Sequence, residues 1–160
     1  MRKHRGPFLF TTLPGQSTNS RFLLLNLEQS SDQGINMSIA LHLPAQAAYA
    51  SVARSMAATI AARCELTYDR VEDARLAIDE AFNQVITNAS ADAEVVCTFV
   101  EEIGAIEFMV QSRTDLEELL PTNTFSWTVL SALVDEVHNT NVDGVLTVIA
   151  RVQEPTDAAA

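Results

Sequence analysis

The sequence predicts an α/β (α+β) domain built as a two-layer sandwich, in which a mixed, mostly antiparallel sheet is covered by helices on one face. Apolar residues recur at helical spacing through the middle of the chain, and two apolar runs that follow are separated by Gly104 alone, so they can pair as a hairpin. The last apolar run lies at 145–152 and predicts a final strand. With 160 residues and 48% hydrophobic content, the chain is long enough to bury one core.

The first half predicts one strand and two helices. Residues 38–44 alternate as a half-buried strand does. A helix over 46–64 is expected to carry an alanine-rich face and an apolar stripe of Tyr49, Val52, Met56, Ile60 and Cys64. Thr67 is the expected N-cap of the next helix, with Asp69 in its first turn. The stripe of that helix is the clearest in the chain and comprises Val71, Ala74, Ile78, Phe82, Val85 and Ala89.

The second half predicts three strands and one helix. Strands are expected over 94–103 and 105–113, and residues 115–124 indicate a loop or a short helical piece. A third helix is expected over 125–139, with Trp127, Leu130, Val134 and Val137 facing inward. Residues 145–152 form the last predicted strand, which gives the order strand, helix, helix, strand, strand, helix, strand.

The domain is expected over 37–153. Residues 1–36 have no sustained periodicity and are interpreted as an extension, or as lying upstream of a true start at Met37, although 21–27 is a short apolar run. Residues 154–160 are interpreted as a tail. No apolar run reaches the roughly 20 residues of a membrane span, and the first residues do not match a signal peptide. The isolated Cys64 and Cys97 are expected to be buried free thiols in a reducing cytoplasm.

Charge is unevenly distributed along the chain. The formal net charge is −11, and from Met37 onward there are 6 basic and 19 acidic residues, a net charge of −13. Such a domain is expected to repel nucleic acid and to attract a basic protein surface. Simple solubility explains the same charge equally well.

Several kinds of chemistry are disfavoured by what the domain lacks. Only Gly104 and Gly144 lie within it, so it has no glycine-rich phosphate loop, and no lysine follows Lys3. The histidines are scattered and match no set of metal ligands, and His42 is expected at the surface. No arrangement of Ser, Cys and His indicates covalent catalysis.

One polar constellation lies on the second predicted helix. Glu80, Gln84 and Thr87 or Asn88 are one turn apart, on the side opposite the apolar stripe. They form either a solvated helix face or a carboxylate base beside an amide oxygen that binds Mg²⁺. Spacing alone leaves both interpretations open.

The same helix resembles the N box of the GHKL superfamily in its anti-sigma-factor kinase branch, the RsbW type. The residues that carry the resemblance are 76–81 (LAIDEA) and 85–89 (VITNA), and residues 125–137 (FSWTVLSALVDEV) resemble the helix that follows the nucleotide lid in that branch. The resemblance extends over about 38–153 and is greatest to the actinobacterial form. It implies a histidine-kinase-like ATPase fold.

The resemblance also implies a nucleotide site, in which Glu80 takes the place of the base. Gln84 stands where an asparagine normally holds Mg²⁺, and Gln84, Asn88 and Ser112 are the candidate cofactor contacts. The expected adenine box reads VQSRTD at 110–115, the expected phosphate box reads TNTFS at 122–126, and neither contains glycine. ATP and Mg²⁺ are therefore possible ligands, but these losses are expected to weaken ATP binding by several orders of magnitude.

Three functions follow as hypotheses. The favoured one is a homodimeric anti-sigma factor that binds a sigma-F-type sigma factor and is countered by an anti-anti-sigma STAS protein. Its expected partner surface includes Tyr68, Asp69, Glu72 and Asp73, together with the first helix. The second is a serine kinase for the anti-anti-sigma protein, and the third is a scaffold or oligomerisation unit. No nucleic acid or membrane partner is expected.

Overall fold

Five strands form one sheet in the order β1-β2-β3-β5-β4, and every pairing is antiparallel. The computed structural model describes residues 38–155. The strands are β1 (Ser38–Pro44), β2 (Glu94–Glu102), β3 (Ala105–Arg113), β4 (Glu136–Val142) and β5 (Val145–Gln153). The predicted extension 1–36 and residues 156–160 of the predicted tail lie outside the described residues.

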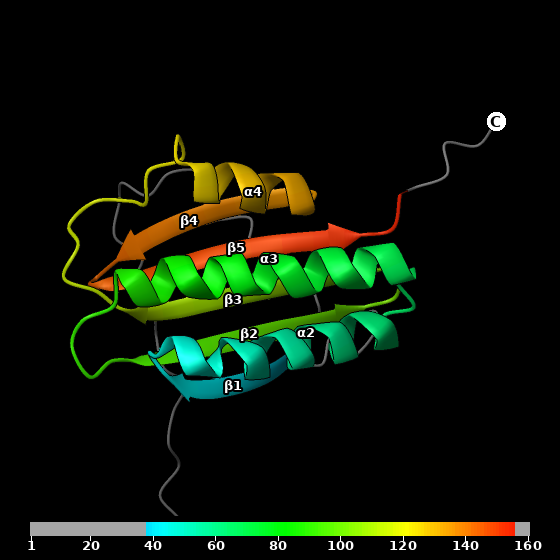
Figure 1. Cartoon of the computed structure of the whole chain (residues 1–160), viewed down its shortest axis with the longest axis horizontal. Helices are drawn as coiled ribbons and strands as arrows, with labels where there is room; N and C mark the ends of the chain where they lie inside the picture. The colour runs from blue at the N-terminus through cyan, green and yellow to red at the C-terminus, as the bar shows by residue number, and fades with distance from the viewer. Residues whose placement is uncertain (1–37, 156–160) are drawn as a thin grey trace, which may run out of the picture. The chain divides into compact units, whose positions relative to one another are not determined.

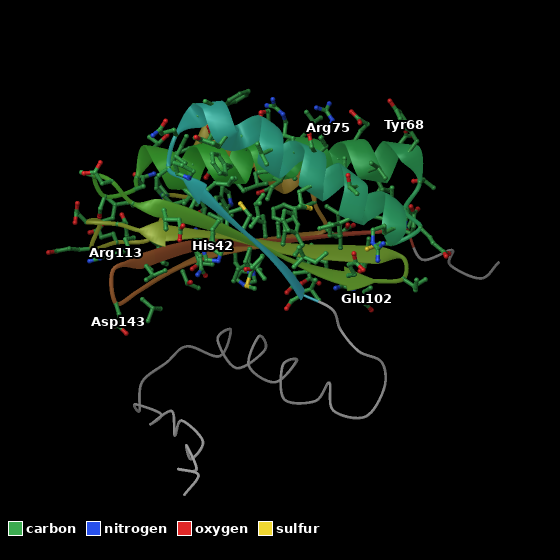
Figure 2. All side chains as sticks on the ribbon, turned by 90° about the horizontal axis from the view of Figure 1, so that it is seen from below. His42, Tyr68, Arg75, Glu102, Arg113 and Asp143 are labelled. Carbon is green, nitrogen blue, oxygen red and sulfur yellow. The ribbon has the colours of Figure 1, made fainter. Side chains whose placement is uncertain are left out.

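The helices α2 (Ala50–Arg63), α3 (Tyr68–Thr87) and α4 (Phe125–Leu133) cover one face of this sheet, and a short 3-10 turn, η2 (Ala47–Tyr49), precedes α2 (Figure 1). Figure 2 shows the two layers from the side, with Tyr68 and Arg75 on the helical layer. The two-layer α+β fold class is confirmed. The sheet is antiparallel throughout the described residues rather than mixed.

The core lies between the helices and the sheet. Its largest fully buried side chains include Phe82 on α3, Phe99 on β2 and Phe108 on β3. The predicted stripe of α3 is confirmed, because the side chains from Ala74 to Val85 that belong to it are buried. On α2, however, the alanine face turns inward against α3, whereas Tyr49 and Val52 are exposed. The small side chains let the two helices approach closely, as the predicted alanine-rich face implies. Of the predicted stripe, Ile60 and Cys64 are buried, whereas Tyr49 and Val52 are not.

The third helix is shorter than expected, and a strand was missed. Helix α4 ends at Leu133, Val134 has extended backbone, and the residues from Glu136 form β4 at the edge of the sheet. Val137 therefore reaches the core from a strand rather than from the predicted helix 125–139. The hairpin turn at Asp143 and Gly144, both with positive φ, joins β4 to β5. Asp-Gly is a strong hairpin signal, and the sequence prediction overlooked it.

Local predictions at the helix and strand ends are largely confirmed. Strands β2 and β3 turn at Gly104, which has a φ of +77°. Thr67 occupies the N-cap position of α3 with extended backbone, but its side chain makes no capping hydrogen bond. His42 is exposed, as predicted, and its Nδ1 lies 2.8 Å from Glu94 Oε2. In the described part of the chain, no helix is long and apolar enough to cross a membrane.

Both cysteines are buried free thiols, as predicted. Cys64 follows α2 and Cys97 lies in the middle of β2. Burial raises the pKa of Cys97 to about 12, so its thiol stays protonated at neutral pH. Cys97 is therefore a poor nucleophile.

A carboxylate on the sheet face opposite the helices gives a pH-dependent prediction. Burial raises the pKa of Glu107 above its ordinary value of 4.5, although Arg151 and His138 act in the opposite direction, and Glu136 and Glu102 add to the increase. The folded state therefore binds this proton more tightly than the unfolded state does. The stabilisation from this proton is complete below pH 4.5 and is lost as the pH rises through the higher pKa of the folded state.

We expect Glu107→Gln to be more stable than the wild type at neutral pH and equally stable below about pH 4, where the carboxyl group is protonated in both states. Urea denaturation across this pH range measures the difference. Glu117→Gln, an exposed change in the loop after β3, is the control, because no pH-dependent gain is expected there. A gain that grows toward acid pH would contradict the assigned sign.

Candidate functional site

A cleft of about 460 Å³ lies between the C-terminal half of α3 and the connection from β3 to α4. In Figure 1 this connection runs along the edge of the molecule and is coloured yellow. The helix and the residue that follows it contribute five polar residues to the cleft: Glu80, Asn83, Gln84, Thr87 and Asn88. The connection and the start of α4 contribute the opposite side: Leu116, Glu118, Leu119, Leu120, Pro121, Thr124 and Ser126. The volume falls in the range of ordinary ligand sites.

The polar constellation predicted on α3 is brought together in this cleft. Asn88, just after the helix, donates from Nδ2 to the carbonyl oxygen of Gln84 at 2.8 Å, and Thr87 Oγ1 donates to the carbonyl oxygen of Asn83 at 2.7 Å. These two side chains are therefore occupied by their own helix. Gln84 differs from them, because its Nε2 is buried and has no hydrogen-bond partner among the described residues. Buried donors are normally paired, so Gln84 Nε2 is an unsatisfied donor in a residue that lines the cleft.

The connection from β3 to α4 is fixed by two asparagines on β4. Asn139 binds the backbone of Leu120 twice: its Oδ1 accepts from Leu120 N at 2.9 Å, and its Nδ2 donates to Leu120 O at 3.4 Å. Asn141 Nδ2 donates to the carbonyl oxygens of Leu116 at 2.8 Å and Glu118 at 3.1 Å. Leu120 itself is buried in the core. The connection is therefore attached to the rest of the domain through its backbone and through the side chain of Leu120.

A further contact joins the start of this connection to the end of α3. Thr114 is buried, and its Oγ1 donates to the carbonyl oxygen of Asn88 at 2.6 Å while accepting from Leu116 N at 3.1 Å. The backbone N–H of Thr114 donates to the carbonyl oxygen of Gly144 at 2.9 Å. The hairpin turn between β4 and β5 thus holds the segment on the far side of the cleft in place.

The charge of the cleft is negative. Among residues 38–155, its lining contains two carboxylates, Glu80 and Glu118, and no lysine or arginine. Neither carboxylate has an ion-pair partner among the described residues. The N-terminus of α4 borders the cleft and is equivalent to about half a positive charge. Its N-cap Thr124 already accepts from Trp127 N. The two full negative charges therefore outweigh the helix end.

This lining does not fit a nucleoside triphosphate with Mg²⁺. Glu80 and Gln84 provide oxygen atoms of the kind that Mg²⁺ prefers, but the described part of the lining offers no basic side chain and no glycine to a phosphate group. In residues 38–155, no group of three or more His, Cys, Asp or Glu side chains is arranged to hold a metal ion. The geometry can instead accept cationic and hydrogen-bonding groups.

One predicted cofactor contact lies elsewhere. Ser112 on β3 does not line the cleft; it is buried, and its Oγ donates to the carbonyl oxygen of Glu94 at 2.9 Å. The residue faces the core because it shares the inward side of β3 with Phe108 and Val110. Its hydroxyl group is hydrogen-bonded to the neighbouring strand, and a cofactor contact at Ser112 stays a prediction.

The predicted partner surface at the start of α3 is less negative than its sequence indicates. Tyr68 is 77% exposed and Asp69 is exposed beside it. Arg75 Nη2 lies 2.7 Å from Glu72 Oε2 and lowers the pKa of that carboxyl, and Arg70 Nη1 lies 2.9 Å from Asp73 Oδ2. Two of the three acids are therefore paired within the helix. A partner for this surface remains a proposal.

Sequence reasoning missed the fixed connection and its two asparagines. Asn139 and Asn141 alternate with other residues in front of the Asp-Gly turn, which is the pattern of a hairpin strand with one polar side. Recognition of this hairpin would have placed both amides on the same face of β4. The carboxylate of Glu118 carried no signal, because the structure of a loop is decided by contacts far away in sequence.

Comparison with known proteins identifies a relative of this chain. No family model matches the chain. The chain is 27% identical over 99 residues to the anti-sigma-F factor RsbW of Mycobacterium tuberculosis, with the same figures for strains CDC 1551 / Oshkosh and ATCC 25618 / H37Rv. The predicted resemblance to the RsbW type is confirmed. The match covers 62% of this chain and 59% of the RsbW protein, so the chain spans less than two thirds of that relative.

A solved structure agrees with the RsbW-type fold. The structure of the RsbU and RsbW domains of a Mycobacterium tuberculosis protein superposes with a TM-score of 0.58 at 17% identity. The superposition covers 73% of this chain and 32% of the other. At this identity the likeness establishes the fold alone, and the sequence match to RsbW carries the argument on function.

Proposed function

We propose that the protein is an anti-sigma factor that acts by binding and sequestering a sigma-F-type sigma factor in the cytoplasm. The observation that carries this proposal is the sequence similarity over 99 residues to a protein named anti-sigma-F factor RsbW. The net charge of −13 from Met37 onward suits a basic protein partner. The proposed activity is therefore binding, with no chemical step.

The cleft supports binding over phosphoryl transfer. A kinase needs groups that balance the charge of the transferred phosphoryl group, usually Arg, Lys or Mg²⁺. The lining supplies two carboxylates in their place. Glu80 has the position that the resemblance gives to a base, but a base alone does not bind the ATP that a kinase also needs. No feature of the cleft favours the kinase alternative.

Three further parts of the proposal come from the resemblance: a homodimer, release by an anti-anti-sigma protein with a STAS domain, and a role in the stress response. The sheet supports the first part. No helix of residues 38–155 covers its second face, where the half-buried Val100 and Met109 lie on adjacent strands. Such a face is suited to pairing with a second copy.

The test is complex formation with a purified sigma-F-type sigma factor from the same organism. We expect a complex whose association slows as salt rises from about 50 mM to about 500 mM, because screening weakens the attraction between acidic and basic surfaces. Surface plasmon resonance measures the rates, and light scattering of the same mixture shows whether two copies of the protein are present. Hen egg-white lysozyme, a basic protein of no relation, is the control. No complex at low salt, or equal binding of lysozyme, would sink the proposal.

A further inference from the structure

The cleft beside α3 combines an unpaired negative charge with an unpaired buried donor. Glu80 and Glu118 lie on opposite sides of it, one on a helix and one on the fixed connection, and neither has a cationic partner among residues 38–155. Gln84 Nε2 is buried in the same wall without an acceptor. A ligand that satisfies all three groups carries a cation and a carbonyl oxygen. A basic residue within a peptide chain carries both.

Large apolar side chains are exposed around the mouth of this cleft. Leu119 is 58% exposed and Leu116 is 39% exposed, although both line it. Phe125 is 83% exposed and stands between Thr124 and Ser126, which also line it. An exposed aromatic side chain next to a cleft is typical of the anchoring positions of protein interfaces. These side chains indicate a ligand with apolar residues on either side of its charge.

The wall that carries these groups is held in shape before any ligand binds. Asn139 and Asn141 fix the backbone from Leu116 to Leu120, and Thr114 fixes its start against α3. A ligand therefore does not have to order this wall when it binds, which lowers the entropic cost of association. The fixed wall also places Glu118 opposite the helix.

We propose that the cleft receives a basic side chain, an arginine or a lysine, from an amphipathic segment of a protein partner. The carboxylates of Glu80 and Glu118 bind the cation, Gln84 Nε2 donates to a carbonyl oxygen of the segment, and Leu119 and Phe125 contact its apolar residues. The position that the resemblance gives to a nucleotide thus serves a protein ligand. The identity of that partner as the sigma factor rests on the proposed function, whereas the chemistry of the cleft does not.

The first arm of the test uses a peptide and needs no natural partner. The peptide acetyl-Ser-Leu-Arg-Leu-Ser-amide is titrated into the isotope-labelled full chain, and so is the same peptide with citrulline, which keeps the shape of arginine without its charge. We expect chemical-shift changes at residues 80–88 and 116–121, and an affinity about tenfold or more higher for the arginine peptide. Equal affinities, or shift changes confined to other surfaces, would overturn the inference.

Matched variants test whether Glu80 and Glu118 are the carboxylates that bind the cation. Glu80→Gln with Glu118→Gln is expected to remove the preference for arginine, because both changes keep the size of the side chains. Glu117→Gln is the control, since this neighbouring carboxylate is exposed and does not line the cleft. An unchanged two-dimensional NMR spectrum away from the cleft shows that each variant is folded. Retention of the preference in the double variant would overturn the inference.

The second arm separates this inference from the proposed function. The same double variant and Phe125→Ala are mixed with the sigma factor, and an affinity loss of about tenfold or more is expected for each. If the sigma factor binds the wild type and both variants equally, the cleft is not its binding site and the inference fails while the proposed function stands. If the sigma factor binds none of them, the proposed function fails, and the peptide arm alone decides the inference.

Discussion

Titration of the full chain with Mg-ATP is expected to give no binding heat up to about 1 mM, which corresponds to a binding free energy weaker than about −4 kcal/mol. The reason is the lining of the cleft, where Glu80 and Glu118 face a ligand that is itself negative. Two like charges about 4 Å apart repel by about 4 kcal/mol at an effective dielectric constant of 20. That amount is about a thousandfold in the dissociation constant.

Two lysine variants test whether charge is the cause. Glu118→Lys places a cation inside the cleft, and Glu117→Lys adds the same charge to the protein just outside it. If local repulsion excludes the nucleotide, isothermal titration should detect tighter binding for Glu118→Lys than for Glu117→Lys. Equal behaviour would show that net charge alone decides. Micromolar binding of Mg-ATP by the wild type, lost in Gln84→Ala, would instead establish a nucleotide site.

The parts of the fold that the sequence predicted are those whose pattern is decided locally. The stripe of α3 repeats over five turns with Phe82 at its centre, and β2 and β3 are joined by a turn at Gly104 that brings neighbours in sequence together. In both cases the periodicity depends on contacts within a few tens of residues. The residues between 125 and 142 were harder, because Val134 and Val137 keep helical spacing beyond the end of α4.

One wall of the candidate site was predicted from the sequence and the other was not, for the same reason. Glu80, Gln84 and Asn88 were predicted to lie together because residues four positions apart lie on the same side of a helix. The opposite wall depends on hydrogen bonds from Asn139 and Asn141 to backbone atoms 19 to 25 residues earlier in the chain. No periodicity records such contacts.

Leu120→Ala is expected to lower the free energy of unfolding by about 2–5 kcal/mol, the cost of removing a buried leucine from a packed core. Leu120 is 6% exposed and packs within the core, whereas its neighbour Leu119 is 58% exposed. Leu119→Ala is therefore a matched control, with an expected change within about 0.5 kcal/mol. Urea denaturation measures the free energy of unfolding of both variants. Both lose a leucine side chain, so only its position differs.

The same pair of variants tests whether the wall of the cleft is held by its side chain or by its backbone. In Leu120→Ala, amide hydrogen exchange over residues 114–124 is expected to accelerate more than exchange in α3, because the anchor of the connection is lost while Phe82 stays buried. Asn139→Ala leaves the buried N–H of Leu120 without its acceptor and should accelerate the same amides. If exchange there is unchanged in Leu120→Ala and fast only in Asn139→Ala, the backbone bonds alone hold the wall. Equal stability losses for Leu119→Ala and Leu120→Ala would contradict the anchoring role, because one leucine is buried and the other is not.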